Sequence, residues 1–208
     1  MSKQQKIITI GIWAILVVAM VGFVASGMWS RMLGSRTHGI EEIELPKFQP
    51  MAAFALVNQA GQPFTSADLA GKVWIGCFFF TRCTGPCPMM TANMAAMQRQ
   101  LADTSVRLLS FSVDPENDTP PVLAEYARKY GADSNRWTFL TGARQDIYGI
   151  AAAIKIAVMP AEGERPILHS TKFILIDGSG TIRGYYDGTD PDARAQLVQH
   201  AKSLAAGP

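Results

Sequence analysis

The feature that most restricts the fold is an unbroken apolar run, VWIGCFFF, at residues 73–80. A strand without polar side chains is buried on both faces, which is typical of the centre of a sheet that helices cover on both sides. A second run of this kind, VRLLSFSVD at residues 106–114, follows a segment, PCPMMTANMAAMQRQLAD, in which we expect a helix. Two strands that flank one helix form a βαβ unit, so we predict that they are parallel.

The α/β pattern continues to the end of the chain. The expected elements are short strands at residues 53–58 and 136–142, helices at 118–130, 143–154 and 189–204, and a hairpin at 172–186 with DGSG as its turn. Residues 51–208 therefore predict one α/β domain, a mixed sheet with helices on both faces. Two cysteines stand where the first central strand ends and its helix begins, and this placement is typical of a thioredoxin-like arrangement.

The N-terminal segment differs in composition from this domain. Residues 7–29 form a run of 23 residues without a charge. As a helix this run would be about 35 Å long, enough to span a bilayer. We predict an uncleaved transmembrane anchor, preceded by a flank at residues 1–6, because the run is longer than a cleaved signal peptide needs. Cleavage at the small residues 25–27 is the alternative.

Charge separates the two ends of the chain. Residues 1–40 hold four Lys or Arg and no acidic residue, whereas residues 41–208 hold 15 basic and 17 acidic residues, a net charge of −2. Basic residues flank the apolar run on both sides, so they do not determine its orientation. Residues 30–50 contain Gly and Pro without clear periodicity, which predicts a linker. The predicted domain has no excess of positive charge, so nothing in it favours nucleic acid as a partner.

Two of the three cysteines, Cys83 and Cys87, lie at the predicted turn from strand to helix. Residues four apart on a helix have Cβ atoms about 5–6 Å apart, so the two thiols can form a disulfide or bind one metal ion. The helix N-terminus and the neighbouring Arg82 favour a reactive thiolate. Packing as small buried side chains is the third interpretation, and the flanking prolines make it the least favoured.

The remaining cysteine and the histidines decide what could join this pair. Cys77 lies inside the apolar strand, where a free cysteine packs as a small hydrophobic side chain. Two thiolates suit a soft metal, and imidazole is a common further ligand for copper. Of the three histidines, His38 lies in the linker and His200 in the last helix, where we expect a surface position. His169 precedes the hairpin strand; in thioredoxin-like folds the loop entering this strand lies against the cysteines, so His169 is the candidate third ligand.

Two other groups near the predicted site have a structural explanation. Asp114 and Pro115 end the second central strand, and we predict a turn there. Asp118 or Thr119 is expected to cap the helix that follows. A series of apolar residues at helical spacing predicts a buried helix face rather than a set of copper ligands. The series is Met90, Met94, Met97 and Leu101.

Three segments give the chain a resemblance to a known family, the Sco/SenC copper proteins of cytochrome c oxidase assembly. FFFTRCTGPCP resembles its strand and CxxxCP motif, FSVDPENDTPPVLAEYARKYG its second strand and helix, and LHSTKFILIDGSGTIRGYY its histidine and hairpin segment. With the N-terminal anchor, the resemblance covers nearly the whole chain. It implies a thioredoxin-like fold in which Cys83, Cys87 and His169 bind a copper ion, as Cu(I), Cu(II) or both.

The sequence departs from the family pattern at two positions. The family often has Pro directly after the first cysteine, where this chain has Thr84, and Asp before the histidine, where this chain has Leu168. The missing carboxylate changes the charge around the predicted metal site, and so bears on copper affinity and on the preferred oxidation state. The set of three ligands is unaffected.

The resemblance implies a metallochaperone held in a bacterial-type inner membrane by residues 7–29, as a single-pass anchor, with its domain on the periplasmic side. It would pass copper by ligand exchange to the copper-bearing subunit of cytochrome c oxidase. Other copper chaperones or thiol reductants are further expected partners.

The residues alone also permit other functions. In a thiol–disulfide oxidoreductase, Cys83 and Cys87 would be the redox-active pair that keeps the acceptor's cysteines reduced. A redox or copper sensor would require a conformational switch that the sequence does not indicate. A peroxidase is less favoured, because the motif lacks an isolated thiol with a separate resolving cysteine.

Overall fold

The computed structural model describes residue 13 and residues 17–23, 44–160 and 167–207. It divides the chain into two compact units, Met1–Glu42 and Ile43–Pro208. In the first unit the described residues are helical. The predicted flank at residues 1–6, most of the predicted anchor and His38 lie outside the described residues. Within the described part of the chain, no helix combines the length and the apolar character needed to cross a membrane.

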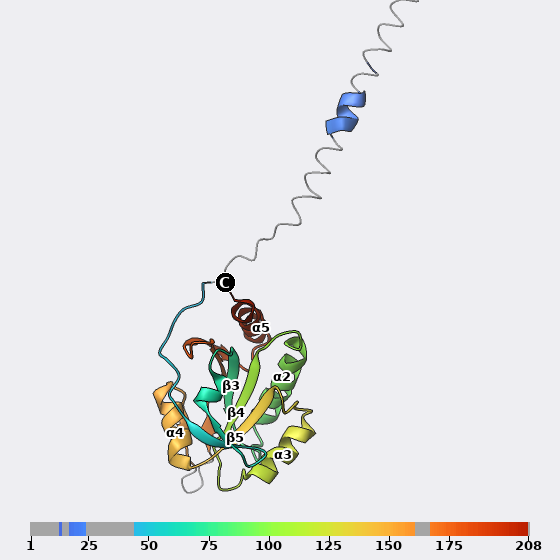
Figure 1. The fold of residues 1–208 in the computed structure, drawn as a ribbon. Helices are drawn as coiled ribbons and strands as arrows, with labels where there is room; N and C mark the ends of the chain where they lie inside the picture. The colour runs from blue at the N-terminus through green and yellow to red at the C-terminus, as the bar shows by residue number, and fades with distance from the viewer. Residues whose placement is uncertain (1–12, 14–16, 24–43, 161–166, 208) are drawn as a thin grey trace, which may run out of the picture. The chain divides into compact units, whose positions relative to one another are not determined.

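The second unit is built on a seven-stranded mixed sheet with the strand order β2-β1-β5-β4-β3-β8-β9 (Figure 1). Its strands are β1 Ala55–Asn58, β2 Pro63–Thr65, β3 Trp74–Phe79, β4 Arg107–Ser112, β5 Trp137–Thr141, β8 Lys172–Ile176 and β9 Ile182–Asp187. β3 and β4 are parallel neighbours, as the two apolar runs predict. β8 and β9 form the predicted antiparallel hairpin, and β8 also pairs antiparallel with β3.

Helices cover both faces of this sheet, as predicted. They are the short 3-10 helix η1 Ser66–Leu69 and the α-helices α2 Cys87–Gln100, α3 Pro120–Lys129, α4 Arg144–Ala153 and α5 Pro191–Ala206. α2, α3 and α5 contribute Met90, Leu123 and Leu197 to one hydrophobic cluster. α4 and η1 contribute Ile147 and Leu69 to the other cluster. Figure 1 shows α4 on the opposite side of the strands from α2 and α3.

Strand β3 shows why the apolar run forms the middle of the sheet. Side chains alternate between the two faces of a strand. Ile75, Cys77 and Phe79 therefore pack into the cluster that contains α2, while Trp74 and Phe78 pack into the cluster that contains α4. Burial of each large apolar side chain contributes about 1.5–3 kcal/mol, so a polar residue at any of these positions would weaken the sheet.

Two predictions of core packing are confirmed. Cys77 is only 3% exposed. The apolar series on α2 and at its C-cap is also buried, and it shares the hydrophobic cluster of Cys77. Its members are Met90, Met94, Met97 and Leu101, each no more than 2% exposed. The sulfur atoms of the three methionines are therefore enclosed in the core, on the side of α2 that faces the sheet.

Short strands account for the topology that periodicity did not reveal. β2 pairs antiparallel with β1, and β1 lies antiparallel to β5. A separate two-stranded sheet consists of β6 Val158–Met159 and β7 Leu168–His169. Its register places His169 opposite Val158. Elements of two to four residues are too short for their side chains to show a repeating pattern.

Residues 45–50, in the second half of the predicted linker, lie against β9. The Phe48 N–H donates to the Ile182 carbonyl at 2.9 Å. The Arg183 guanidinium donates to the Leu45 carbonyl at 2.7 Å, and the Leu45 side chain is buried. This stretch, called the edge segment below, is therefore part of the packed unit.

Candidate metal centre

Cys87 is the first residue of α2 and is fully buried. Pro86 at the N-cap and Pro88 in the first turn help to fix the start of this helix, because proline needs no N–H partner there. Burial raises the pKa of the Cys87 thiol, and the Cys83 thiol adds to that effect, while a hydrogen bond with the Phe80 backbone opposes it. The helix N-terminus therefore does not make Cys87 a thiolate; without a metal it is a neutral thiol at pH 7.

His169 lies next to Cys87. Its Nε2 is 2.7 Å from the Cys87 Sγ, and its Nδ1 donates a hydrogen bond to the Ser170 carbonyl at 3.0 Å. A proton on Nδ1 leaves the lone pair on Nε2, so Nε2 accepts from the thiol and is the nitrogen available to a metal. Burial lowers the pKa of His169, which keeps the imidazole neutral at pH 7. The Phe80 ring lies at a steep angle to the imidazole, with centroids 5.7 Å apart.

Cys83 lies on the loop between β3 and α2 and is half-buried. Its N–H donates to the Phe80 carbonyl at 3.4 Å, and its Sγ accepts from the Gly85 N–H at 3.4 Å. The Sγ atoms of Cys83 and Cys87 and a ring nitrogen of His169 all lie within 4.8 Å of one another. The structure thus brings together the three residues that the sequence singled out.

The cluster has the dimensions and chemistry of a site for one metal ion. Metal–sulfur and metal–nitrogen bonds are about 2.0–2.3 Å long, so two ligands of one ion can be up to about 4.5 Å apart. The donor atoms lie within 4.8 Å of one another, so small side-chain rotations suffice. Two thiols and a neutral imidazole form a soft donor set, which favours copper or zinc over Mg²⁺ and Ca²⁺.

Arg82, expected to favour a thiolate, is paired with an acid instead. Its guanidinium lies 3.1 Å from the Asp114 carboxylate. Asp114 also accepts hydrogen bonds from the Asn117 side chain. The turn predicted at Asp114 and Pro115 is present, because the N–H groups of Asn117 and Asp118 donate to the Asp114 carbonyl.

Asp118 makes contacts that its sequence position did not predict. Its side chain is fully buried, and Thr119 occupies the N-cap position of α3 without a side-chain hydrogen bond. The Asp118 carboxylate accepts from the Thr81 N–H at 3.1 Å, from the Thr81 hydroxyl at 2.5 Å and from the Ser112 hydroxyl at 2.5 Å. Burial raises the pKa of Asp118, and these hydrogen bonds oppose that shift. The Thr81 partner is 37 positions away, so no local pattern could have revealed it.

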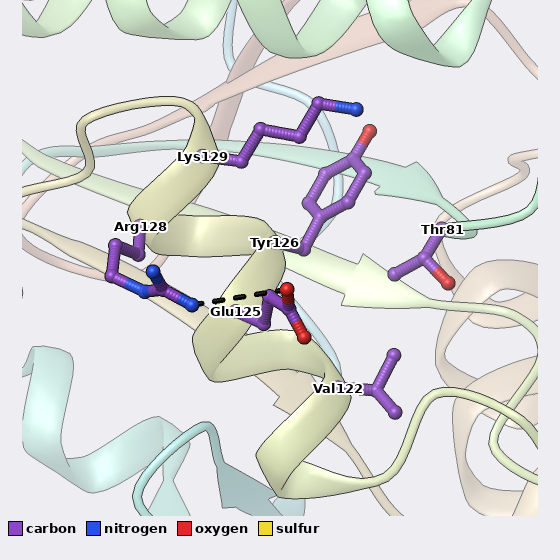
Figure 2. Close-up of a pocket in the computed structure, with 6 residues that line it drawn as sticks. All are labelled: Thr81, Val122, Glu125, Tyr126, Arg128 and Lys129. Atoms are coloured by element: carbon purple, nitrogen blue, oxygen red, sulfur yellow. Dashed lines mark ion pairs between the residues drawn. The ribbon is translucent and has the colours of Figure 1, made fainter.

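A cavity of about 370 Å³ is lined by Thr81 and by residues of α3. Figure 2 shows Thr81 across this cavity from α3. The lining residues from α3 are Val122, Glu125, Tyr126, Arg128 and Lys129. Glu125 and Arg128 form an exposed ion pair at 3.8 Å. None of the three clustered donor residues lines this cavity, so it is distinct from the candidate metal centre.

The remaining positions of interest lie around or away from the cluster. Leu168 is 55% exposed beside His169, so an apolar side chain stands where the family often has a carboxylate. Thr84 is exposed on the loop. His200 is half-buried on α5 rather than free at the surface, with its Nδ1 2.7 Å from the Tyr186 hydroxyl.

Comparison with known proteins places this geometry in a family. The sequence model of the family described as SCO1/SenC matches residues 44–206. The SCO1 protein homolog of Bacillus subtilis is 35% identical over 171 residues, which cover 80% of this chain and 89% of that protein.

Two solved structures have the same fold. BsSco, described as a member of the Sco family of cytochrome c oxidase assembly proteins, is similar with a TM-score of 0.69 and 33% identity, over 79% of this chain and 98% of that one. Yeast Sco1 with copper bound has a TM-score of 0.62 and 24% identity, over 77% of this chain and 92% of that one. Because the family match extends over most of its length, this chain belongs to the SCO1/SenC family and has its thioredoxin-like fold.

Proposed function

We propose that this protein is a copper metallochaperone that binds one copper ion through Cys83, Cys87 and His169. The observation that carries the proposal is the convergence of two sulfur atoms and one ring nitrogen within 4.8 Å of one another. The hydrogen bond from Nδ1 to Ser170 supports it, because it leaves the Nε2 lone pair directed to the cluster.

Copper suits this donor set in both oxidation states. Thiolates are soft ligands that select Cu(I), and an imidazole is also a common ligand of Cu(II). Family membership supports the choice of copper, as does the fold shared with copper-bound yeast Sco1. Leu168 supplies no negative charge beside the imidazole, which removes one stabilising influence on the more highly charged Cu(II) ion.

Transfer to an acceptor requires that a ligand of the partner can reach the ion. Cys83 is half-buried whereas Cys87 is fully buried, so the incoming ligand would displace Cys83 first. The proposed acceptor is the copper-bearing subunit of cytochrome c oxidase, by analogy with BsSco and its description as an oxidase assembly protein. Other copper chaperones would load the site, and thiol reductants would keep its cysteines reduced.

The proposed location is a bacterial-type inner membrane, with residues 7–29 as a single-pass anchor and the copper-binding domain on the periplasmic side. The uncharged run of 23 residues supports this placement. Protease treatment of spheroplasts should digest the domain while the membrane remains intact. Full protection of the domain, or its release into the soluble fraction on lysis, would contradict this location.

The test of copper binding compares two histidines in the full-length, reduced protein. His169→Ala should weaken Cu(II) binding sharply and Cu(I) binding less, because Cu(I) can remain bound to two thiolates. His200→Ala is the matched control, since it also removes a half-buried imidazole, and it should leave both affinities unchanged. Affinities are measured by competition with chelators, and oxidase assembly is followed in cells.

A thiol–disulfide oxidoreductase is the second candidate, favoured by the contact between the Cys87 thiol and the His169 imidazole. In such an enzyme the two thiols carry out the reaction, and the imidazole assists a thiol without being bonded to either sulfur. His169→Ala should then cycle between dithiol and disulfide within about tenfold of the parent rate, a barrier change of about 1.4 kcal/mol. Unchanged copper affinity and unchanged oxidase assembly in this variant would favour the oxidoreductase over the metallochaperone.

A further inference from the structure

The three donor residues are not held equally. Cys87 is fully buried at the start of α2, and His169 is held between the Cys87 thiol and the Ser170 carbonyl. Cys83 lies on a loop, and the hydrogen bonds of its own N–H and Sγ are both 3.4 Å long. The first contact is long for an N–H···O bond, and in the second the sulfur is a weak acceptor, so the position of Cys83 depends on what holds the rest of the loop.

The shortest hydrogen bond of this loop is made by Thr81, two residues before Cys83. Thr81 donates both its N–H and its hydroxyl to the Asp118 carboxylate, at 3.1 and 2.5 Å. The same carboxylate accepts from the Ser112 hydroxyl at the end of β4. Asp118 is 0% exposed, and hydrogen bonds to a buried charged acceptor are among the stronger ones in proteins. Asp118 therefore joins the loop to β4 and to the start of α3.

A second contact on the loop is weaker. Arg82 pairs with Asp114 at 3.1 Å, but the Arg82 side chain is 64% exposed. Solvent and salt screen an ion pair of this kind, and its contribution is small. The buried junction at Asp118, and not the exposed pair at Arg82, is thus the contact that fixes the loop.

We infer that Asp118 is a positioning residue: acting through Thr81, it holds Cys83 close to Cys87 and His169. The expected effect of Asp118 on copper binding rests on the proposed function. Its expected effect on the distance between the two thiols does not. The hydrogen bonds of the Asp118 carboxylate join the two separated motifs FFFTRC and SVDPENDTP, since the first contributes Thr81 and the second Ser112 and Asp118.

The test uses one substitution at Thr81 that removes the hydroxyl and one that keeps it. Thr81→Val removes the hydroxyl and keeps the backbone N–H, whereas Thr81→Ser keeps the hydroxyl. The matched control is Thr104→Val, the same chemical change at a residue whose hydroxyl donates to the Leu101 carbonyl at 2.7 Å. Thr104 follows the C-terminal end of α2, about 20 Å along the helix from the cluster.

The first measurement needs no metal. In glutathione buffer the Cys83–Cys87 dithiol gives two electrons and two protons to oxidised glutathione; one S–S bond forms in the full-length protein and two molecules of reduced glutathione leave. A looser loop lowers the effective concentration of one thiol near the other, so Thr81→Val should shift this equilibrium about tenfold toward the dithiol. Thr81→Ser and Thr104→Val should remain within about twofold of the parent by the same reasoning.

The second measurement is Cu(II) affinity together with the visible and electron paramagnetic resonance spectra at saturation. Thr81→Val and Asp118→Asn should bind more weakly and give altered, heterogeneous spectra, and Thr81→Ser should restore the parent spectra. If Asp118→Asn does not fold, the Thr81 series alone decides the result.

Three outcomes are distinguishable. A parent-like thiol equilibrium in Thr81→Val would overturn the inference. An equal shift in Thr104→Val would also overturn it, because the effect would then follow stability and not position. A shift confined to Thr81→Val, in a protein whose parent form binds no copper, would support the positioning role and refute the copper function.

Discussion

The interior of β3 and the start of α2 each contain a buried thiol, and the two differ in what surrounds them. Cys77 is 3% exposed and Cys87 is 0% exposed. Burial raises the pKa of Cys77 to about 12 and also raises the pKa of Cys87. The nearest polar partner of Cys77 is the Ser110 hydroxyl at 3.5 Å, whereas that of Cys87 is the His169 imidazole at 2.7 Å.

This comparison shows that burial and thiol pKa do not distinguish a packing cysteine from a candidate ligand. The Ser110 hydroxyl beside Cys77 also accepts from the Trp137 indole, so the polar groups around Cys77 are hydrogen-bonded to one another. Cys87 has a second thiol and an unprotonated ring nitrogen within 4.8 Å. Convergence of donor atoms at the end of the strand, and not the state of either thiol, separates the two regions.

The largest expected difference between the regions is in copper binding. Cys87→Ser or Cys83→Ser should lower copper affinity by more than about 100-fold, because loss of a ligand exceeds the effect of losing a residue that supports one. Cys77→Ser should still bind one copper, and its new hydroxyl lies near Ser110 as a partner. Metal content and chelator competition measure both. Loss of copper from a folded Cys77→Ser variant would break the comparison.

Oxidation should abolish copper uptake at the turn. A disulfide between Cys83 and Cys87 offers no thiolate, and metal binding requires deprotonated ligands. The oxidised protein should take up no Cu(I) until it is reduced, which anaerobic titration before and after reduction would detect. Similar uptake by the two redox forms would mean that the metal binds elsewhere.

The pH dependence of copper binding follows from the raised pKa of Cys87. The thiol keeps its proton at pH 7–8, so binding must release that proton, and apparent affinity should rise at least about tenfold per pH unit in this range. The lowered pKa of His169 means that the imidazole is already neutral there and releases none. The number of protons released per copper ion bound can be measured directly in weakly buffered solution. An affinity that does not change between pH 7 and 8 is inconsistent with this account.

The smallest expected effect concerns stability at Cys77. Its pKa is raised from 9.0 to about 12 in the folded protein, so unfolding exposes a thiol that ionises more readily. The stabilisation is fully present below about pH 9 and is lost as pH rises toward 12. At pH 10 the parent should have lost about 1 kcal/mol that Cys77→Ala does not lose. Urea unfolding of both proteins at pH 8 and 10 tests this, and parallel losses would contradict it.

The central fold was predictable because its signals are local. The unbroken apolar run predicts a strand with two buried faces, and β3 has them. Periodicity and prolines also indicated the four α-helices that follow. The cysteine spacing, together with the family resemblance, selected Cys83, Cys87 and His169, and the structure brings these residues together. Their role as copper ligands stays a prediction.

The remaining features depend on contacts between distant parts of the chain. Asp118 is a plausible helix cap by its position, yet its carboxylate bonds to Thr81, 37 residues away. Arg82 lies next to Cys83, but its guanidinium turns to Asp114. The pairing of His169 with Val158 involves strands of only two residues. None of these has a periodic or compositional signal.

The edge segment, residues 45–50, has a consequence for how copies of this protein behave beside one another. An unpaired strand edge is a template on which a second molecule can add a strand. Here the Phe48 N–H donates a hydrogen bond to the Ile182 carbonyl at the start of β9. The opposite edge of the sheet is the three-residue strand β2, which begins with a proline. A chain shortened to begin at residue 51 should self-associate more than one beginning at residue 44, which light scattering would detect; equal monomeric behaviour would refute this. The segment thus protects the edge of β9 from pairing with another molecule. Its removal would expose backbone groups on which a second chain can add a strand.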